Sequence, residues 1–370
     1  PLRDISFDFL LDEAMDNAYS IGREGNMLER IRTILRVKYQ NVNISVKSDF
    51  SRQSLADVLN DIKKEVDIKE KDASAAYING NMVFSKEVIG QELDVDKSIE
   101  LIENRIHERN FSVVDLCIQK VFPRVMYEDI CDIEEVIGSF STAFNTGKAD
   151  RSYNIKLACE RINNTLLLTG DVFSMDRALG PRSFDNGYRD APVIIKGRLV
   201  EGVGGGVCQV TTTLYAAVLK AKMGIVERTG HSQVLGYVEP GQDATIAEGY
   251  IDFKFKNNLE YAVLVNAQVV GNKVVVRLLG KKGTENFDIR LKSVILEEIS
   301  PGEDEIILDK SLSPGDREVV RASSKGLRVA VYRETVDKSG RIVDREKISE
   351  DLYRPVKGVV KVNYVNDYIY

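Results

Sequence analysis

The residues best suited to chemistry in this chain are Cys208 and His231, which lie 23 positions apart. Cys208 follows the glycine-rich stretch 202–207 and begins a segment in which apolar residues recur every three to four positions as far as residue 221. That spacing predicts a helix, ended by Gly224, with Cys208 in its first turn. The free N–H groups and the dipole of a helix start favour a thiolate, and an imidazole nearby can deprotonate the thiol. The pattern therefore predicts a cysteine nucleophile with His231 as its base.

Such a nucleophile needs a third group that orients the imidazole and donors that stabilise an oxyanion. Asp243 is the preferred orienting carboxylate, ahead of Asp252, and Gln209 with the N–H groups of the helix start is the predicted oxyanion hole. A glycine-rich turn, a cysteine at a helix start and a downstream histidine occur in this order in papain-like and transglutaminase-like folds. That analogy concerns the fold alone.

Two readings without a cysteine nucleophile stay open. In the first, Cys208 packs as a small apolar residue, and the glycines either allow close packing or cradle a bound ligand. Arginines then bind carboxylates and tyrosines offer stacking faces, although the chain has no tryptophan. In the second, a carboxylate pair cleaves glycans. The candidate ligand-binding residues are Gly204, Gly205, Gly206, Gln209, Arg182, Tyr188 and Arg228, with Arg189, Arg198, Tyr215 and Tyr237 as further possibilities. The candidate acids are Asp185, Asp190, Asp243, Glu248 and Asp252.

Composition limits the kinds of protein that this chain can be. At 370 residues with 43% hydrophobic residues, it is long and apolar enough for two or three domains with real cores. A formal net charge of −6 argues against a nucleic-acid partner. No run approaches the roughly 18–20 apolar residues of a membrane span. The chain starts at Pro1 without a signal peptide, which we interpret as the removal of a targeting or anchoring segment.

Cysteine and histidine usage argues against a metal centre. The four cysteines, Cys117, Cys131, Cys159 and Cys208, form no C-x-x-C pair, and only His107 and His231 could add imidazole ligands. No D-x-D-x-D-G loop indicates calcium. We therefore predict no metal and no cofactor. Cys159 lies on an apolar helical face and is expected in the core, whereas His107 is expected at the surface.

The periodicity divides the chain into three predicted domains, at residues 1–124, 125–288 and 289–370. The first is a small α+β domain, and the second packs the Cys208 helix on an antiparallel sheet. The third is an all-β module, so the fold class is multidomain α+β. The predicted elements are helices at 8–19, 54–66 and 95–108, a hairpin at 75–84, a sheet holding strands 250–256 and 261–279, and a hairpin at 329–348.

Residues 173–256 resemble the VanW family, a bacterial group first noticed in glycopeptide-resistance gene clusters. One departure is Glu201, where the family commonly has proline. The matching sequence motifs are Gly180-Pro181-Arg182, Gly187-Tyr188, 191–194 (APVI), 202–215 (GVGGGVCQVTTTLY), Glu227-Arg228, His231-Ser232, 240–245 (PGQDAT) and 251–255 (IDFKF).

Two flanking resemblances cover most of the remaining chain. Residues 13–120, with the motif AYSIGR at 18–23, are similar to a peptidoglycan-binding domain that often precedes the VanW module. The tail is similar to the glycine-named β-rich domain of surface proteins, through Gly315, Gly326, Gly340 and Tyr353-Arg354-Pro355.

The resemblances imply an exported envelope protein of a Gram-positive-type bacterium that binds peptidoglycan or its stem peptides, with links to the glycopeptide response. They imply membrane contact only through an anchor outside this chain. Remodelling of peptidoglycan is an open extension of this hypothesis. One form is a cysteine-dependent peptidase or transpeptidase with Cys208 and His231, and the lesser form is carboxylate-dependent glycan cleavage.

Overall fold

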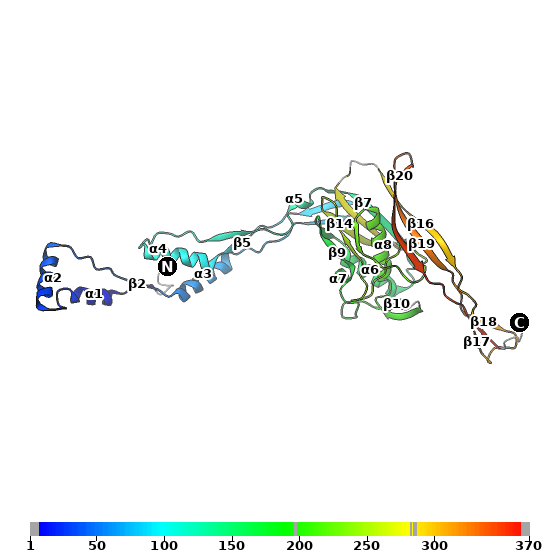
Figure 1. Cartoon of the computed structure of the whole chain (residues 1–370), viewed down its shortest axis with the longest axis horizontal. Helices are drawn as coiled ribbons and strands as arrows, with labels where there is room; N and C mark the ends of the chain where they lie inside the picture. The colour runs from blue at the N-terminus through cyan, green and yellow to red at the C-terminus, as the bar shows by residue number, and fades with distance from the viewer. Residues whose placement is uncertain (1–6, 196–197, 282, 284–286, 364–370) are drawn as a thin grey trace. The chain divides into compact units, whose positions relative to one another are not determined.

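The computed structural model describes residues 7–195, 198–281, 283 and 287–363 (Figure 1). The chain is a multidomain α+β protein, as predicted. Its contacts form two compact units, one of Pro1–Asp72 with Glu87–Arg124 and one of Ala73–Lys86 with Val125–Tyr370. The hairpin formed by strands β3 (Ser74–Ile78) and β4 (Asn81–Ser85) is present as predicted, but it belongs to the second unit. The boundaries 1–124, 125–288 and 289–370 remain a prediction.

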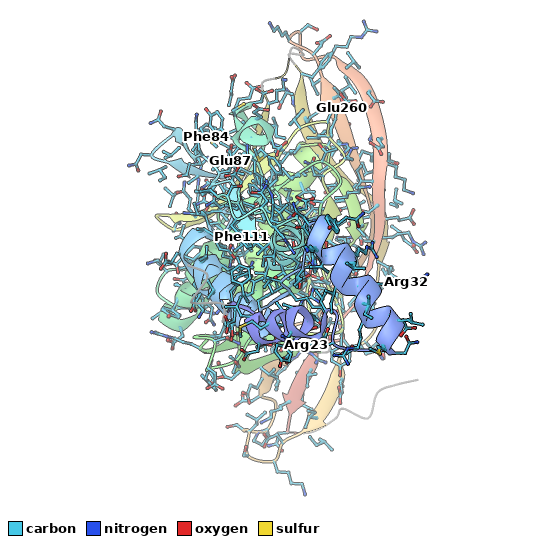
Figure 2. The ribbon with its side chains drawn as sticks, turned by 90° about the vertical axis from the view of Figure 1, so that its left-hand side faces the viewer. Arg23, Arg32, Phe84, Glu87, Phe111 and Glu260 are labelled. Atoms are coloured by element: carbon cyan, nitrogen blue, oxygen red, sulfur yellow. The ribbon has the colours of Figure 1, made fainter. Side chains whose placement is uncertain are left out.

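The first unit is helical with a small apolar core. Leu55, Leu59, Leu93 and Ile99 are buried there. Ser51 caps α3, because the Ser54 N–H donates to the Ser51 hydroxyl at 3.1 Å, so this helix begins before the predicted residue 54. Figure 2 shows Arg32 on α2 and Arg23 in the turn after α1. The elements are α1 (Leu11–Ser20), α2 (Met27–Tyr39), α3 (Arg52–Val66), α4 (Val95–His107) and the strand pairs β1 (Asp8–Phe9) with β2 (Ser48–Asp49) and β5 (Gly90–Leu93) with β6 (Ile118–Val121).

The second unit is built on a four-stranded antiparallel sheet in the order β7, β15, β14, β8. Two helices pack on this sheet, α6 (Ala149–Ile162) and α8 (Val207–Lys220), as Figure 1 shows. Nearly every side chain of α8 is buried, including its threonines, so this helix is the centre of the core. The strands are β7 (Ile133–Ala143), β15 (Lys273–Lys281), β14 (Val263–Val270) and β8 (Thr165–Leu167), and α5 (Tyr127–Ile130) precedes β7.

A second sheet corrects the sequence prediction. Strand β13 (Lys254–Lys256) was expected beside 261–279, but it pairs with β12 (Gly224–Glu227) and β9 (Val172–Ser174). Burial of Phe255 against Phe173, with ring centroids 5.0 Å apart, favours this pairing. Gly224 opens β12 and does not end the helix, since Ala221 occupies the cap of α8. The hairpin of β10 (Asp190–Ile195) and β11 (Arg198–Val203) and the short helix α7 (Met175–Leu179) complete this region.

The described part of the C-terminal region contains strands alone, as predicted. One sheet has the antiparallel order β16 (Asp288–Ile299), β19 (Gly326–Val336), β20 (Ile342–Tyr353), and a smaller one has the order β17 (Glu305–Leu308), β21 (Val359–Val362), β18 (Arg317–Arg321). Strand β16 contacts α8, and the Arg333 guanidinium donates to the Leu219 carbonyl at 3.2 Å. The all-β region is thus packed against the core helix. None of the described helices is long and apolar enough to cross a membrane.

Candidate active site

The glycine run sets the position of Cys208 through its backbone. Gly204 and Gly206 have φ values of +86° and +108°, which side chains disfavour, and Gly206 is the N-cap of α8. A Cβ on Gly205 would lie 2.5 Å from the Ala191 carbonyl oxygen, so only glycine fits there. Gly205 thus packs against β10, whereas Gly204 and Gly206 line a cavity.

Asn154, which the sequence analysis missed, holds this turn in place. It lies fully buried on α6, and its side-chain amide donates to the Gly205 carbonyl at 3.1 Å and the Arg189 carbonyl at 2.9 Å. Its side-chain oxygen accepts from the Arg189 N–H at 2.9 Å. A polar residue on the apolar face of a predicted helix was the available signal, since buried amides need partners.

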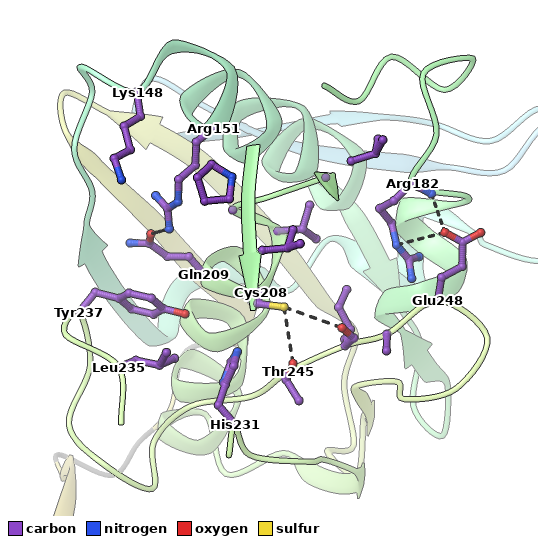
Figure 3. A pocket seen from close by; sticks show the side chains of 18 residues that line it. Lys148, Arg151, Arg182, Cys208, Gln209, His231, Leu235, Tyr237, Thr245 and Glu248 are labelled. Atoms are coloured by element: carbon purple, nitrogen blue, oxygen red, sulfur yellow. Dashed lines mark hydrogen bonds and ion pairs between the residues drawn. The ribbon is translucent and has the colours of Figure 1, made fainter. Parts of the chain in front are cut away.

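The structure brings Cys208, His231 and Asp243 together in a hydrogen-bonded series. The Asp243 carboxylate lies 2.7 Å from His231 Nδ1 and also accepts from the His231 backbone N–H at 2.7 Å. The imidazole hydrogen-bonds the Cys208 thiol on its other side, and Figure 3 shows the ring pointing toward the sulfur. Cys208 Sγ also lies 3.6 Å from the hydroxyl of Thr245, a residue that sequence reasoning did not single out.

The electrostatics of this series favour an ion pair. Burial alone would raise the pKa of the Cys208 thiol, but the hydrogen bond and charge of His231 outweigh burial and lower the pKa. Burial would lower the pKa of His231, but Asp243 and the Cys208 thiolate raise it to about 9. The hydrogen bonds from His231 likewise outweigh burial at Asp243 and lower its pKa. Both shifts favour a thiolate and an imidazolium over the neutral pair.

The all-β region adds a further member to this series, Tyr353. Its hydroxyl donates to the second Asp243 oxygen and accepts from the Gly241 N–H at 2.5 Å. The Tyr353 side chain is buried, at the end of β20. Sequence reasoning missed this residue, because 110 positions separate it from Asp243 and no local pattern joins them.

The cysteine faces a cavity of about 460 Å³. Gln209 lines it but is fully engaged, since its amide donates to Thr142 Oγ1 at 3.0 Å and to the Ala143 carbonyl at 2.8 Å. Its side chain therefore has no N–H left for the predicted oxyanion hole. The Cys208 backbone N–H has no acceptor among the described residues, so it is an available donor at the helix start. Other lining residues are Lys148, Arg151, Arg182, His231, Leu235, Tyr237, Thr245 and Glu248 (Figure 3).

Among the predicted ligand-binding side chains, Arg182 reaches the cavity and Tyr188 does not. Arg182 is paired with Asp176 at 2.5 Å and Glu248 at 3.6 Å, and its side chain is 9% exposed. Tyr188 is 1% exposed in the core, with its hydroxyl donating to the Leu179 carbonyl. The Tyr188 ring therefore cannot meet a ligand in this structure, because apolar packing covers it.

The side chain of Arg228 is likewise buried and paired within the protein, so it is not free to bind a ligand. Its guanidinium pairs with Asp351 of β20 and donates to the carbonyls of Asp243 and Gly241. Its side chain is 7% exposed. This arginine ties the loop that carries Asp243 to the all-β region.

Arg189 and Asp252 have partners other than the cysteine. Arg189 pairs with Asp150 at 3.0 Å, and the side chain of Arg198 falls outside the part that the structure describes. Asp252 accepts from the Ser174 hydroxyl at 2.6 Å, so it does not contact the imidazole. Among the described residues, no group of three or more histidine, cysteine or acidic side chains is arranged to hold a metal ion.

Three family models match successive parts of the chain. "Putative peptidoglycan binding domain" matches residues 1–115, "VanW like protein" matches 150–279, and "G5 domain" matches 292–363. These domains fit an extracytoplasmic protein associated with the cell wall.

Two curated proteins are similar to the chain. "Uncharacterized protein YoaR" of Bacillus subtilis (strain 168) is 37% identical over 168 residues, covering 45% of this chain and 55% of the relative. "Vancomycin B-type resistance protein VanW" of Enterococcus faecalis (strain ATCC 700802 / V583) is 28% identical over 170 residues, covering 44% and 60%. The chain thus spans somewhat more than half the length of these relatives.

Two solved structures are similar to about a fifth of this chain. "Crystal structure of HP0197-G5" has 22% sequence identity and a TM-score of 0.13, covering 21% of this chain and 99% of that one. "IgA1 Protease G5 domain structure" has 18% identity and a TM-score of 0.15, covering 22% and 98%. The family matches thus identify a VanW-like domain in this chain between a putative peptidoglycan-binding domain and a G5 domain, and the similarity to the two curated proteins supports the VanW match.

Proposed function

We propose that this protein binds peptidoglycan and that its VanW-like domain is a cysteine-dependent peptidase or transpeptidase acting on the stem peptides. The observation that carries the proposal is the series Cys208, His231 and Asp243 at the wall of a cavity. Perturbed titratable groups that meet in a cavity are typical of active sites. The family match at 1–115 supports the choice of peptidoglycan, and similarity to the resistance protein supports a role in the glycopeptide response.

Each residue has a defined role in this proposal. With Nδ1 donating to Asp243, the Nε2–H of the imidazolium faces Cys208. The thiolate attacks an amide carbonyl carbon, and the Cys208 N–H stabilises the oxyanion that forms. His231 then donates its Nε2 proton to the leaving amine, and the C–N bond breaks to leave a thioester. Water releases the acid in a peptidase, and an amine forms a new amide bond in a transpeptidase.

The test is incubation of the purified chain with soluble muropeptides, followed by mass spectrometry of the peptides and of the protein. We expect shortened or newly cross-linked stem peptides from the wild type, and none from Cys208→Ala. Cys131→Ala is the matched control, because Cys131 is also partly exposed but has no histidine partner among the described residues. It should retain activity.

Turnover by Cys208→Ala would contradict the nucleophile assignment. Absence of both product and acyl-enzyme from the wild type, across stem peptides of different length and cross-linking, would contradict the enzymatic proposal. Retention of the chain on purified sacculi tests the binding part separately, because Cys208→Ala should bind as well as the wild type.

A further inference from the structure

One wall of the cavity carries two cations without a carboxylate partner, Arg151 and Lys148. Both belong to the start of α6, with Lys148 as the N-cap residue and Arg151 in the first turn. The nearest acidic residue in sequence, Asp150, pairs with Arg189 at 3.0 Å. No ion pair of Arg151 or Lys148 occurs within the ranges that the structure describes. A partly buried guanidinium without a carboxylate partner is unusual, because burying a charge costs free energy.

Arg151 is held in a fixed position. One guanidinium N–H donates to the Gln209 side-chain oxygen at 2.8 Å. Because the Gln209 amide is itself tied to Thr142 and Ala143, its oxygen can only face Arg151. The other N–H donors of the guanidinium have no partner among the described residues, and Arg151 lines the cavity. A guanidinium held in this way can donate two parallel hydrogen bonds to the two oxygens of a carboxylate.

The two ends of the cavity differ in whether their cations have carboxylate partners. The Arg182 end is neutralised by Asp176 and Glu248. Figure 3 shows Arg182 and Glu248 on one side of Cys208, with Arg151 and Lys148 on the other. Arg151 and Cys208 line the same cavity and interact through their charges, so an anion bound at Arg151 lies near the sulfur.

We propose that Arg151 and Lys148 form an anion subsite that binds the C-terminal carboxylate of a peptide, so that the domain removes or replaces residues at free peptide ends. This inference rests on the proposed function and narrows its substrate class. A carboxylate bound next to the nucleophile places the last amide bond of the peptide at Cys208. Peptides with a blocked C-terminus would lose these charge-assisted hydrogen bonds and leave Arg151 unpaired.

The experiment measures binding without catalysis. Cys208→Ala is titrated by calorimetry with a stem tetrapeptide, its C-terminal amide, and the same peptide with the side-chain carboxylate replaced by an amide. We expect the C-terminal amide to bind roughly 10- to 100-fold more weakly, as loss of a charge-assisted hydrogen bond implies. Arg151→Gln in the same background should bind the acid and the C-terminal amide about equally, and Lys148→Met should show a smaller loss. Arg189→Gln is the matched control, as a neighbouring arginine outside the cavity, and should keep the preference.

Equal binding of acid and C-terminal amide by the Cys208→Ala protein would overturn the inference, as would an unchanged preference in Arg151→Gln. Loss of affinity only when the side-chain carboxylate is blocked would also overturn it, because the subsite would then bind that side chain and not the C-terminus. If the preference for a free C-terminus is found while the wild type shows no turnover, the subsite stands and the proposed enzymatic function fails.

Discussion

Two helices of the same core carry cysteines with opposite chemistry. Cys159 lies in the second half of α6, 1% exposed, and burial raises the pKa of its thiol to about 12. Cys208 lies at the start of α8, partly exposed at the cavity, and His231 outweighs burial to lower the pKa of its thiol. Both residues are on well-packed helices of one domain. The difference teaches that a charged partner and an opening to solvent decide whether a cysteine is reactive.

The largest expected effect is the contrast between the two thiols themselves. At pH 7 we expect iodoacetamide to alkylate Cys208 on the order of 1000-fold faster than Cys159, because only the thiolate reacts and the two pKa values are far apart. Peptide mapping by mass spectrometry after timed quenching measures both rates in one sample. Comparable rates for the two residues would break the comparison.

The next effect comes from removing the imidazole. His231→Ala should raise the pKa of Cys208, because the largest interaction that opposes burial is then lost, and the alkylation rate at pH 7 should fall by roughly 10- to 100-fold. His107→Ala is the matched control, since this exposed histidine belongs to the other compact unit. An unchanged Cys208 rate in His231→Ala would mean that the helix start alone activates the thiol.

A smaller effect is expected at Asp243. Wild-type activity should rise as Cys208 deprotonates and fall again near pH 9, where His231 loses its proton. Asp243→Asn removes the carboxylate that raises the pKa of His231, so this upper limb should move to lower pH, with kcat reduced roughly tenfold or more. The measurement is a pH profile of kcat, with the exposed Asp185→Asn as control. An upper limb that stays in place would show that Asp243 does not set the imidazole pKa.

The smallest effect tests the contribution of the all-β region. Tyr353→Phe keeps the ring but removes the hydroxyl that holds Asp243 and satisfies the Gly241 N–H. We expect a loss of about 1–3 kcal/mol in the free energy of unfolding, the usual cost of a buried unsatisfied group. We also expect a few-fold decrease in kcat with KM little changed, because a positioning residue does not touch substrate. Denaturant unfolding measures the loss of stability, and steady-state kinetics measure the change in kcat. A loss of stability with an unchanged kcat would show that Tyr353 contributes to packing and does not position Asp243 for catalysis.

The sequence by itself determined the local features of the site. Apolar spacing placed Cys208 at the start of a helix, and the glycine run before it required the turn that the structure shows at Gly204 and Gly206. The same kind of pattern predicted the hairpin at β3 and β4 and the all-β tail. These features depend on contacts between residues close in sequence, which periodicity and turn residues report directly.

Only the tertiary structure decided which groups meet around these elements. Tyr353 reaches Asp243 from 110 positions away, and both N–H groups of the Gln209 amide are bonded to Thr142 and Ala143 of strand β7. The arginines look alike in the sequence, yet Arg228 is buried in ion pairs and Arg151 has no carboxylate partner in the described part of the chain. The physical reason is that burial and charge pairing depend on chain segments brought together by the packing of α6, α8 and the two sheets. A short stretch of sequence carries no record of what packs against it.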